Sequence, residues 1–182
     1  LGLAQGARVA VLMQNSAEMA LLLFGAGKAG VCVVPLNTSV SDAAVAAMVR
    51  DSGAGAIAAS GEHCLRVDAL LAAGQLPGTS IKLGVDVPDA GHWTDLAPWL
   101  ERQSAAAPAV RVDPATECNV IYSSGTTGLP KGVAKPFVPT PLETTSNGVS
   151  PMLGMLFGMT SDSCYLTPAP FYHAAPLRFS MA

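Results

Sequence analysis

The chain has 182 residues, which suits one domain or two small ones and is long enough to bury a hydrophobic core. Its net charge is −3 and it contains no basic run, so nucleic acid is not an expected partner. The longest apolar stretch, residues 19–34, is interrupted by Lys28 and by several glycines. It falls short of the roughly 18 uninterrupted residues of a spanning helix, so no transmembrane segment is expected.

The composition is nevertheless unusually apolar. Charged residues make up 13% of the chain, against about 25% in ordinary soluble domains, and the mean hydropathy is +0.40. We interpret this as the signature of a piece of a larger protein whose other parts cover apolar faces, an interpretation that the first residue, Leu1, also favours. Residues 1–20 lack the features of a signal peptide. We therefore expect a cytoplasmic protein.

The four cysteines are scattered along the chain and form no CxxC pair, so they indicate neither a metal site nor a disulfide framework. We expect reduced thiols in or near the core. The cysteines are Cys32, Cys64, Cys118 and Cys164.

The first 85 residues alternate between short apolar runs and helix-forming stretches. Runs of this kind predict buried strands, here at 8–13, 31–36, 54–60 and 81–85. Helices are expected between them, the second over 42–52 with Ser39 or Ser41 as its cap, and the third ending near Ala73. This alternation predicts an α/β fold, with a mainly parallel sheet flanked by helices.

The start of the first helix has a specific signature. Asn15 is followed three residues later by Glu18, which resembles a capping box, and Gly30 can end the helix. Farther along, the pattern becomes less regular. We expect short helices at 93–102 and 150–159, and strands at 118–122, 132–135 and 164–167.

The most informative segment is YSSGTTGLPKG, residues 122–132. Its glycines allow the backbone to approach a ligand, and successive N–H groups with several hydroxyls can surround an anion. Lys131 adds a mobile positive charge that suits phosphate, and Pro130 stiffens the chain before it. The spacing is not that of a Walker motif, and the segment joins two expected strands. A polyphosphate is the expected ligand; a simple turn is the alternative.

The other titratable side chains give weaker signals. We expect His63 and His92 to lie on the surface. Asp113, Glu117 and Asp162 form no recognisable carboxylate pair, and we interpret them as solvated loop charges.

Three stretches of the sequence resemble a known family of enzymes. IYSSGTTGLPKGV, residues 121–133, closely resembles the phosphate-loop signature of the adenylate-forming (AMP-binding) superfamily, which includes acyl- and aryl-CoA synthetases, luciferases and the adenylation domains of peptide synthetases. Two further stretches, 6–37 and 166–179, resemble the beginning of the N-terminal domain and the segment with an aromatic–histidine pair beside the acyl pocket. The sequence YHAAPLRF, residues 172–179, is most similar to that of bacterial acyl-CoA synthetases that act on fatty or related acids.

The resemblance implies an N-terminal part of an enzyme that converts a small carboxylic acid and ATP into an acyl-adenylate, with Mg²⁺, and then transfers the acyl group to coenzyme A. It divides the chain into a first α/β portion, 1–115, and a phosphate-loop and acyl-site portion, 116–182. Tyr172 and His173 are implied at the acyl site. The implied ATP phosphate-binding residues are Ser123, Ser124, Gly125, Thr126, Thr127, Gly128 and Lys131.

Several features depart from the family pattern or leave alternatives open. The segment after the loop, AKPFVPTP, has no histidine where many members carry one. We expect the main catalytic lysine and the C-terminal domain to lie outside residues 1–182, and these residues alone to be inactive. No metal site is expected within these residues. The sequence does not determine the oligomeric state, and an oligomer is possible. The alternatives are a truncated, inactive nucleotide-binding relative and an amino-acid adenylation domain that feeds a carrier protein.

Overall fold

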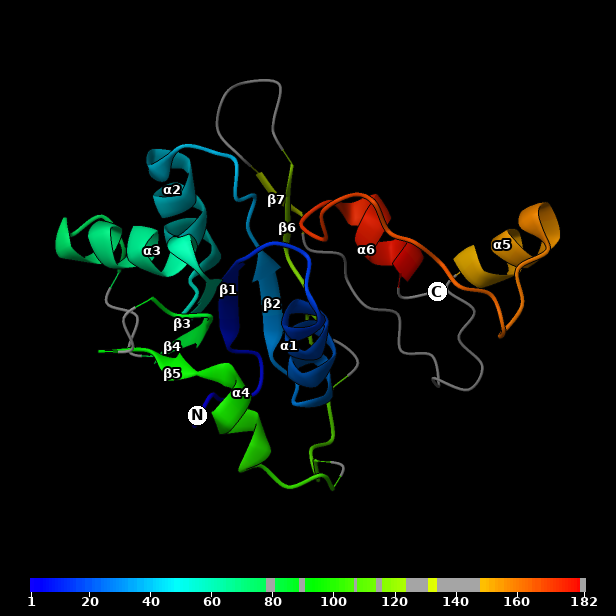
Figure 1. Cartoon of the computed structure of the whole chain (residues 1–182), viewed down its shortest axis with the longest axis horizontal. Coiled ribbons are helices and arrows are strands. Elements are labelled where there is room, and N and C mark those ends of the chain that lie inside the picture. The colour runs from blue at the N-terminus through cyan, green and yellow to red at the C-terminus, as the bar shows by residue number, and fades with distance from the viewer. Residues whose placement is uncertain are drawn as a thin grey trace.

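The computed structural model describes residues 1–77, 81–88, 91–106, 108–113, 116–123, 131–133 and 148–180. Its centre is a five-stranded sheet in the order β2-β1-β3-β4-β5, in which every pair of neighbours is parallel (Figure 1). The predicted α/β fold with a mainly parallel sheet is therefore confirmed. The strands are β1 (Arg8–Leu12), β2 (Cys32–Pro35), β3 (Ala56–Ser60), β4 (Ile81–Val85) and the unexpected short β5 (Thr94–Asp95).

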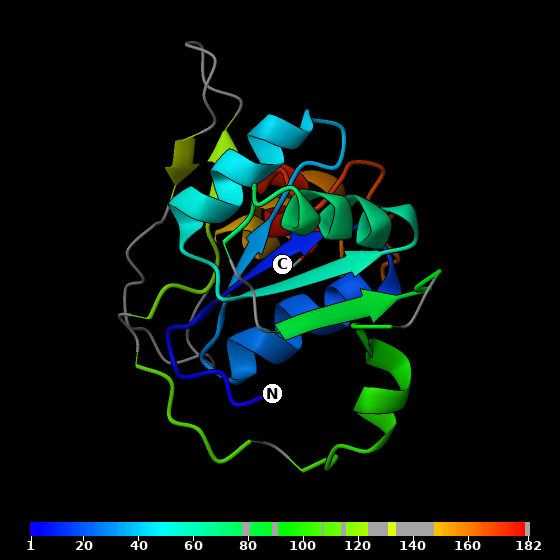
Figure 2. The same ribbon diagram turned by 90° about the vertical axis from the view of Figure 1, so that its left-hand side faces the viewer.

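Two helices cover each face of this sheet, as Figure 2 shows from the side. On one face lie α2 (Asp42–Ser52) and α3 (Glu62–Ala72), and on the other lie α1 (Ala17–Lys28) and α4 (Leu96–Glu101). Successive residues of a strand point to opposite faces. In β1, Ala10 and Leu12 accordingly join the α2–α3 core, whereas Val9 and Val11 join the α1–α4 core. Strands buried on both faces explain the continuous apolar runs in the sequence.

The cap of α1 differs from the prediction. Ser16, not Asn15, is the N-cap, and its Oγ accepts a hydrogen bond of 3.2 Å from the backbone N–H of Met19. Gly30 follows the helix with a φ of +71°, a left-handed conformation that favours glycine, as predicted. For α2 the structure selects Ser41 as the cap. The Asn15 side chain is thereby left for another contact, described below.

The second half of the chain contains an antiparallel pair, β6 (Ile121–Ser123) with β7 (Lys131–Val133), followed by α5 (Val149–Phe157) and α6 (Ala174–Ser180). The helix expected at 150–159 is confirmed, whereas α6 was not expected. The strand expected at 164–167 is wrong. In the described part of the chain no strand pairs with this segment, and two prolines, Pro168 and Pro170, follow it. An extended apolar run needs a neighbouring strand to become part of a sheet.

Several side chains lie elsewhere than the sequence suggested. His63 is buried with 8% exposure, because it lies on the sheet-facing side of α3, and burial lowers its pKa. Cys32 and Cys64 are buried core thiols, and burial raises the pKa of each to about 11. Cys118 and Cys164 are exposed instead, and all four thiols are free. Among the described residues, no helix is long and apolar enough to cross a membrane.

Candidate ATP-phosphate and acyl sites

The candidate phosphate loop, residues 123–131, begins and ends on the antiparallel pair β6–β7. Its two end residues, Ser123 and Lys131, are register partners across this ladder, and both are exposed. The sequence motif is therefore bracketed by two strands, as predicted, rather than followed by a helix. The predicted ligands between them, Ser124, Gly125, Thr126, Thr127 and Gly128, lie outside the described residues.

The segment that leads into β6 is attached to the edge of the main sheet. The backbone N–H of Val33 donates to the carbonyl of Cys118 at 3.1 Å, and the N–H of Val120 donates back to the carbonyl of Val33 at 3.0 Å. These bonds make a parallel bridge between Val33 in β2 and Asn119. The bridge places the segment that leads into β6 beside β2, the edge strand of the sheet.

An ion pair attaches the same segment to Arg8, the first residue of β1. One Arg8 nitrogen donates to Glu117 Oε2 at 2.6 Å, and the other donates to the carbonyl of Ser52 at 2.7 Å. The interpretation of Glu117 as a solvated loop charge is therefore wrong, because Glu117 is half-buried against Arg8. Asp113 and Asp162 are exposed, as expected.

A third contact ties β6 to helix α2. The hydroxyl of Tyr122 donates to Asp51 Oδ2 at 2.6 Å and lies 3.2 Å from the carbonyl oxygen of Met48. Burial, followed by the contact with Asp51, raises the pKa of Tyr122 above its usual value, so the hydroxyl keeps its proton at neutral pH. Tyr122 directly precedes Ser123, the first residue of the candidate loop.

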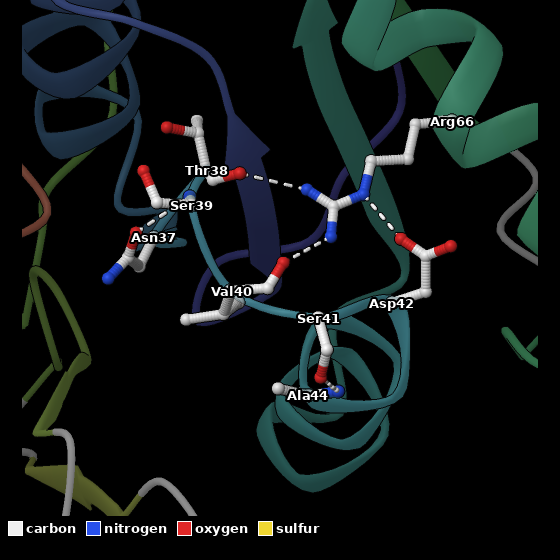
Figure 3. Close-up of polar contacts among 8 residues, drawn as sticks. All are labelled: Asn37, Thr38, Ser39, Val40, Ser41, Asp42, Ala44 and Arg66. Carbon is white, nitrogen blue, oxygen red and sulfur yellow. Dashed lines mark hydrogen bonds and ion pairs between the residues drawn. The ribbon is translucent and has the colours of Figure 1, made fainter.

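Helix α2 is itself held at its N-terminus, as Figure 3 shows. The guanidinium of Arg66, on α3, donates to Asp42 Oδ1 at 2.6 Å, to the carbonyl of Thr38 at 2.9 Å and to the carbonyl of Val40. Arg66 thereby fixes the loop 36–41, which follows β2, and the first residue of α2. By bonding two backbone carbonyls and a carboxylate at once, this fork of donors acts as a structural anchor.

The candidate acyl segment, residues 166–173, is fixed at the carboxyl end of β1. The side chain of Asn15 contacts its backbone twice: Nδ2 donates to the carbonyl of Ala169 at 3.0 Å, and Oδ1 accepts from the N–H of Phe171 at 2.9 Å. In α/β sheets, ligands bind outside the carboxyl ends of the strands. Asn15 thus brings the candidate acyl segment to the edge where sites of such folds usually form.

The two residues predicted for the acyl site differ in exposure. Tyr172 is buried and His173 is exposed, and their rings lie 4.7 Å apart between centroids at an angle of 59°. His173 lies directly before α6, and its carbonyl accepts from the N–H of Leu177 at 3.3 Å. Its imidazole is therefore carried by the start of a helix and reaches solvent.

An apolar hollow of about 340 Å³ lies beside these residues, but neither of them lines it. Its wall includes the small side chains of Ala169 and Ala175, and the Thr167 hydroxyl is buried there without a hydrogen-bond partner. The remaining lining residues are Tyr165, Pro168, Pro176 and Phe179. Such a hollow suits an apolar group more than a charged one.

Sequence reasoning missed the side chains that position these segments, namely Asn15, Asp51 and Arg66. The only sequence signal near them was the capping-box pattern, which pointed to a different role for Asn15. Among the described residues, no group of three or more His, Cys, Asp or Glu side chains could hold a metal ion.

The chain is similar to known proteins in both sequence and structure. The family described as AMP-binding enzyme matches residues 1–182. Long-chain-fatty-acid–CoA ligase FadD13 of Mycobacterium tuberculosis is 33% identical over 178 residues, which cover 97% of this chain and 33% of that protein. Fatty acid–[acyl-carrier-protein] ligase ScoC of Streptomyces coeruleorubidus is 35% identical over 133 residues, 72% of this chain and 24% of that protein.

Among solved structures, the inhibitor-bound N-terminal domain of FACL13 from Mycobacterium tuberculosis superimposes with a TM-score of 0.75 at 32% identity. The match covers 98% of this chain and 42% of that chain. Nearly all of this chain matches FadD13, but the chain spans only about a third of the length of that curated relative.

Proposed function

Because the chain belongs to the AMP-binding enzyme family, we propose that it forms the ATP-phosphate-binding and acyl-binding part of an acid–thiol ligase. The reaction has two steps. A carboxylate oxygen attacks the α-phosphorus of ATP, pyrophosphate leaves, and an acyl-adenylate results. The thiol of coenzyme A then attacks the acyl carbonyl, AMP leaves, and a thioester forms.

The observation that supports this proposal most strongly is the pairing of Ser123 with Lys131 across the ends of the candidate phosphate loop. A hydroxyl and an ammonium group on neighbouring, exposed strand ends can contact one bound anion together. In the first step, negative charge moves onto the β- and γ-phosphates as pyrophosphate departs. Fixed donors and a positive charge at that point stabilise the transition state. Mg²⁺, when bound with ATP, neutralises further phosphate charge.

We place the acyl chain near Tyr172 and His173, with the hollow beside Ala169 and Ala175 as part of the apolar surroundings. The exposed imidazole of His173 can contact the polar end of a substrate, while the hollow suits its hydrocarbon part. A fatty acid is the substrate class that we propose, supported by the name of FadD13 and by the apolar lining. The division into portions 1–115 and 116–182 follows the same assignment and stays a prediction.

A second candidate differs only in the acceptor thiol. ScoC, as its name states, ligates a fatty acid to an acyl carrier protein, and its identity to this chain is as high as that of FadD13. The thiol of a carrier-protein phosphopantetheine would then replace that of coenzyme A. The first, adenylate-forming step would be the same, and so would the roles of Ser123 and Lys131.

The test uses the protein that contains residues 1–182, with ATP, Mg²⁺ and a panel of fatty and aromatic acids. Carboxylate-dependent release of pyrophosphate supports adenylate formation. Thioester formation with coenzyme A, compared with a phosphopantetheine-bearing carrier protein, identifies the acceptor. No pyrophosphate release with any acid would contradict the proposal and favour a nucleotide-binding protein without ligase activity.

A further inference from the structure

The strand pair that carries the candidate phosphate loop has little to hold it in place by itself. It consists of three residue pairs, Ile121–Val133, Tyr122–Gly132 and Ser123–Lys131. All three β7 residues are exposed. A two-stranded hairpin of this kind is only marginally stable on its own. The position of Ser123 and Lys131 must therefore depend on contacts outside the ladder.

One side chain makes such contacts on two sides. The ring of Tyr122 lies directly against Gly132 on the partner strand: a Cβ added at Gly132 would come within 3.3 Å of Tyr122 Cζ. The hydroxyl at the other end of the ring donates to Asp51 on α2 at 2.6 Å. Tyr122 thus touches both β7 and α2, and it is the immediate neighbour of Ser123.

Asp51, the hydrogen-bond partner of Tyr122, lies on a helix that is firmly packed in the core. Helix α2 buries Val45, Met48 and Val49 in the core, and Arg66 holds its first residue, Asp42. Asp51, in the last turn of α2, is therefore presented from a fixed element rather than from a loop. A binding group is held most accurately when its supporting residues are themselves locked by packing.

We propose that Tyr122 and Asp51 are positioning residues for Ser123 and Lys131, and that their hydrogen bond sets the affinity for the triphosphate of ATP by fixing these two residues against α2. The inference rests on the proposed function. Neither residue needs to touch the nucleotide. Binding groups that are already held in place lose less conformational freedom when a ligand binds, so loss of the Tyr122–Asp51 hydrogen bond weakens ATP binding.

The test compares Tyr122→Phe, Asp51→Ala and the double variant in the protein that contains residues 1–182. Tyr122→Phe keeps the ring on Gly132 and removes only the hydroxyl. Each single variant is expected to raise the KM for ATP about fivefold to twentyfold, while the KM for the carboxylate stays unchanged. The double variant is expected to match the single ones, because both remove the same bond. Asp86→Asn, at an exposed carboxylate, is the control for loss of one negative charge.

An unchanged KM for ATP in Tyr122→Phe would overturn the inference. So would equal changes in both KM values together with a lower melting temperature, because these indicate a merely structural role. Direct calorimetric titration with ATP and Mg²⁺ separates this inference from the proposed function. If the wild-type protein binds ATP but releases no pyrophosphate, the proposed function fails, and weaker ATP binding by Tyr122→Phe still supports the role of the Tyr122–Asp51 hydrogen bond. If the wild-type protein binds no ATP, both fail.

Discussion

The side-chain oxygen of Asn15 accepts a hydrogen bond of 2.9 Å from the backbone N–H of Phe171, a residue 156 positions farther along the chain. The same side chain donates to the carbonyl of Ala169. An asparagine amide can act as donor and acceptor at once, so it pairs with a backbone as another backbone would. The candidate acyl segment is thereby fixed to the end of β1.

Replacing Asn15 with alanine is expected to loosen this segment. Amide hydrogen exchange at Phe171 should become about fivefold faster, because a typical hydrogen bond contributes about 1 kcal/mol. In an active enzyme, the KM for the carboxylate should rise while the KM for ATP stays the same. Ser16→Ala is the matched control: it removes the α1 cap and lowers stability by about 1 kcal/mol, without an effect at Phe171. Equal exchange at Phe171 in Asn15→Ala and wild type would contradict this role.

Arg66 is expected to be a larger contributor to stability than its charge partner. Arg66→Ala removes three hydrogen bonds and leaves the carbonyls of Thr38 and Val40 without this donor. We expect the free energy of unfolding in urea to fall by about 2–3 kcal/mol. Asp42→Asn should lower it by less than about 1 kcal/mol, because the Asp42 side chain is 61% exposed. Similar losses in the two variants would show that the ion pair, and not the backbone anchor, matters.

The buried His63 is expected to make stability dependent on pH. Burial lowers its pKa in the folded chain, with the nearby Arg66 acting in the same direction and Glu62 opposing it. Below an unfolded pKa of about 6.5, the unfolded chain therefore binds more protons than the folded one. Stability should fall as the pH decreases from about 6.5 towards the folded pKa.

Urea titrations between pH 7.5 and 5 check this for wild type and His63→Gln. The variant should lose less stability over this range, whatever its stability at pH 7.5. His92→Gln, at an exposed histidine, is the control for removal of an imidazole. An identical pH dependence in wild type and His63→Gln would show that His63 does not cause the pH dependence of stability.

The sequence predicts the main sheet well because its strands are buried on both faces. Residues 9–12 and 31–35 are apolar and buried at every position, and this pattern has few other interpretations. Residues 164–167 show the limit of that reasoning. They have the composition of a strand, but whether a partner strand lies beside them depends on the rest of the fold.

The candidate sites, like the sheet, were predicted only in part from the sequence. The composition of the 122–132 segment indicates an anion, and β6 and β7 bracket it as expected. The side chains that fix it were not foreseen, because Tyr122 and Asp51 are 71 positions apart and neither has a distinctive local pattern. Asn15 was misassigned because Ser16, its neighbour, is an equally good cap. Contacts of this range follow from the packing of α2 and β1, which local sequence patterns do not encode.

Carboxylate-dependent exchange of labelled pyrophosphate into ATP, measured for wild type and Lys131→Ala, tests whether the protein forms an acyl-adenylate with the help of Lys131. Exchange reports formation and reversal of the acyl-adenylate and needs no thiol acceptor. We expect exchange in the wild-type protein that depends on a fatty acid and falls by about tenfold to a hundredfold in Lys131→Ala, since a charge at the departing phosphates is lost. Exchange that needs no carboxylate, or that is equal in Lys131→Ala and wild type, would contradict it.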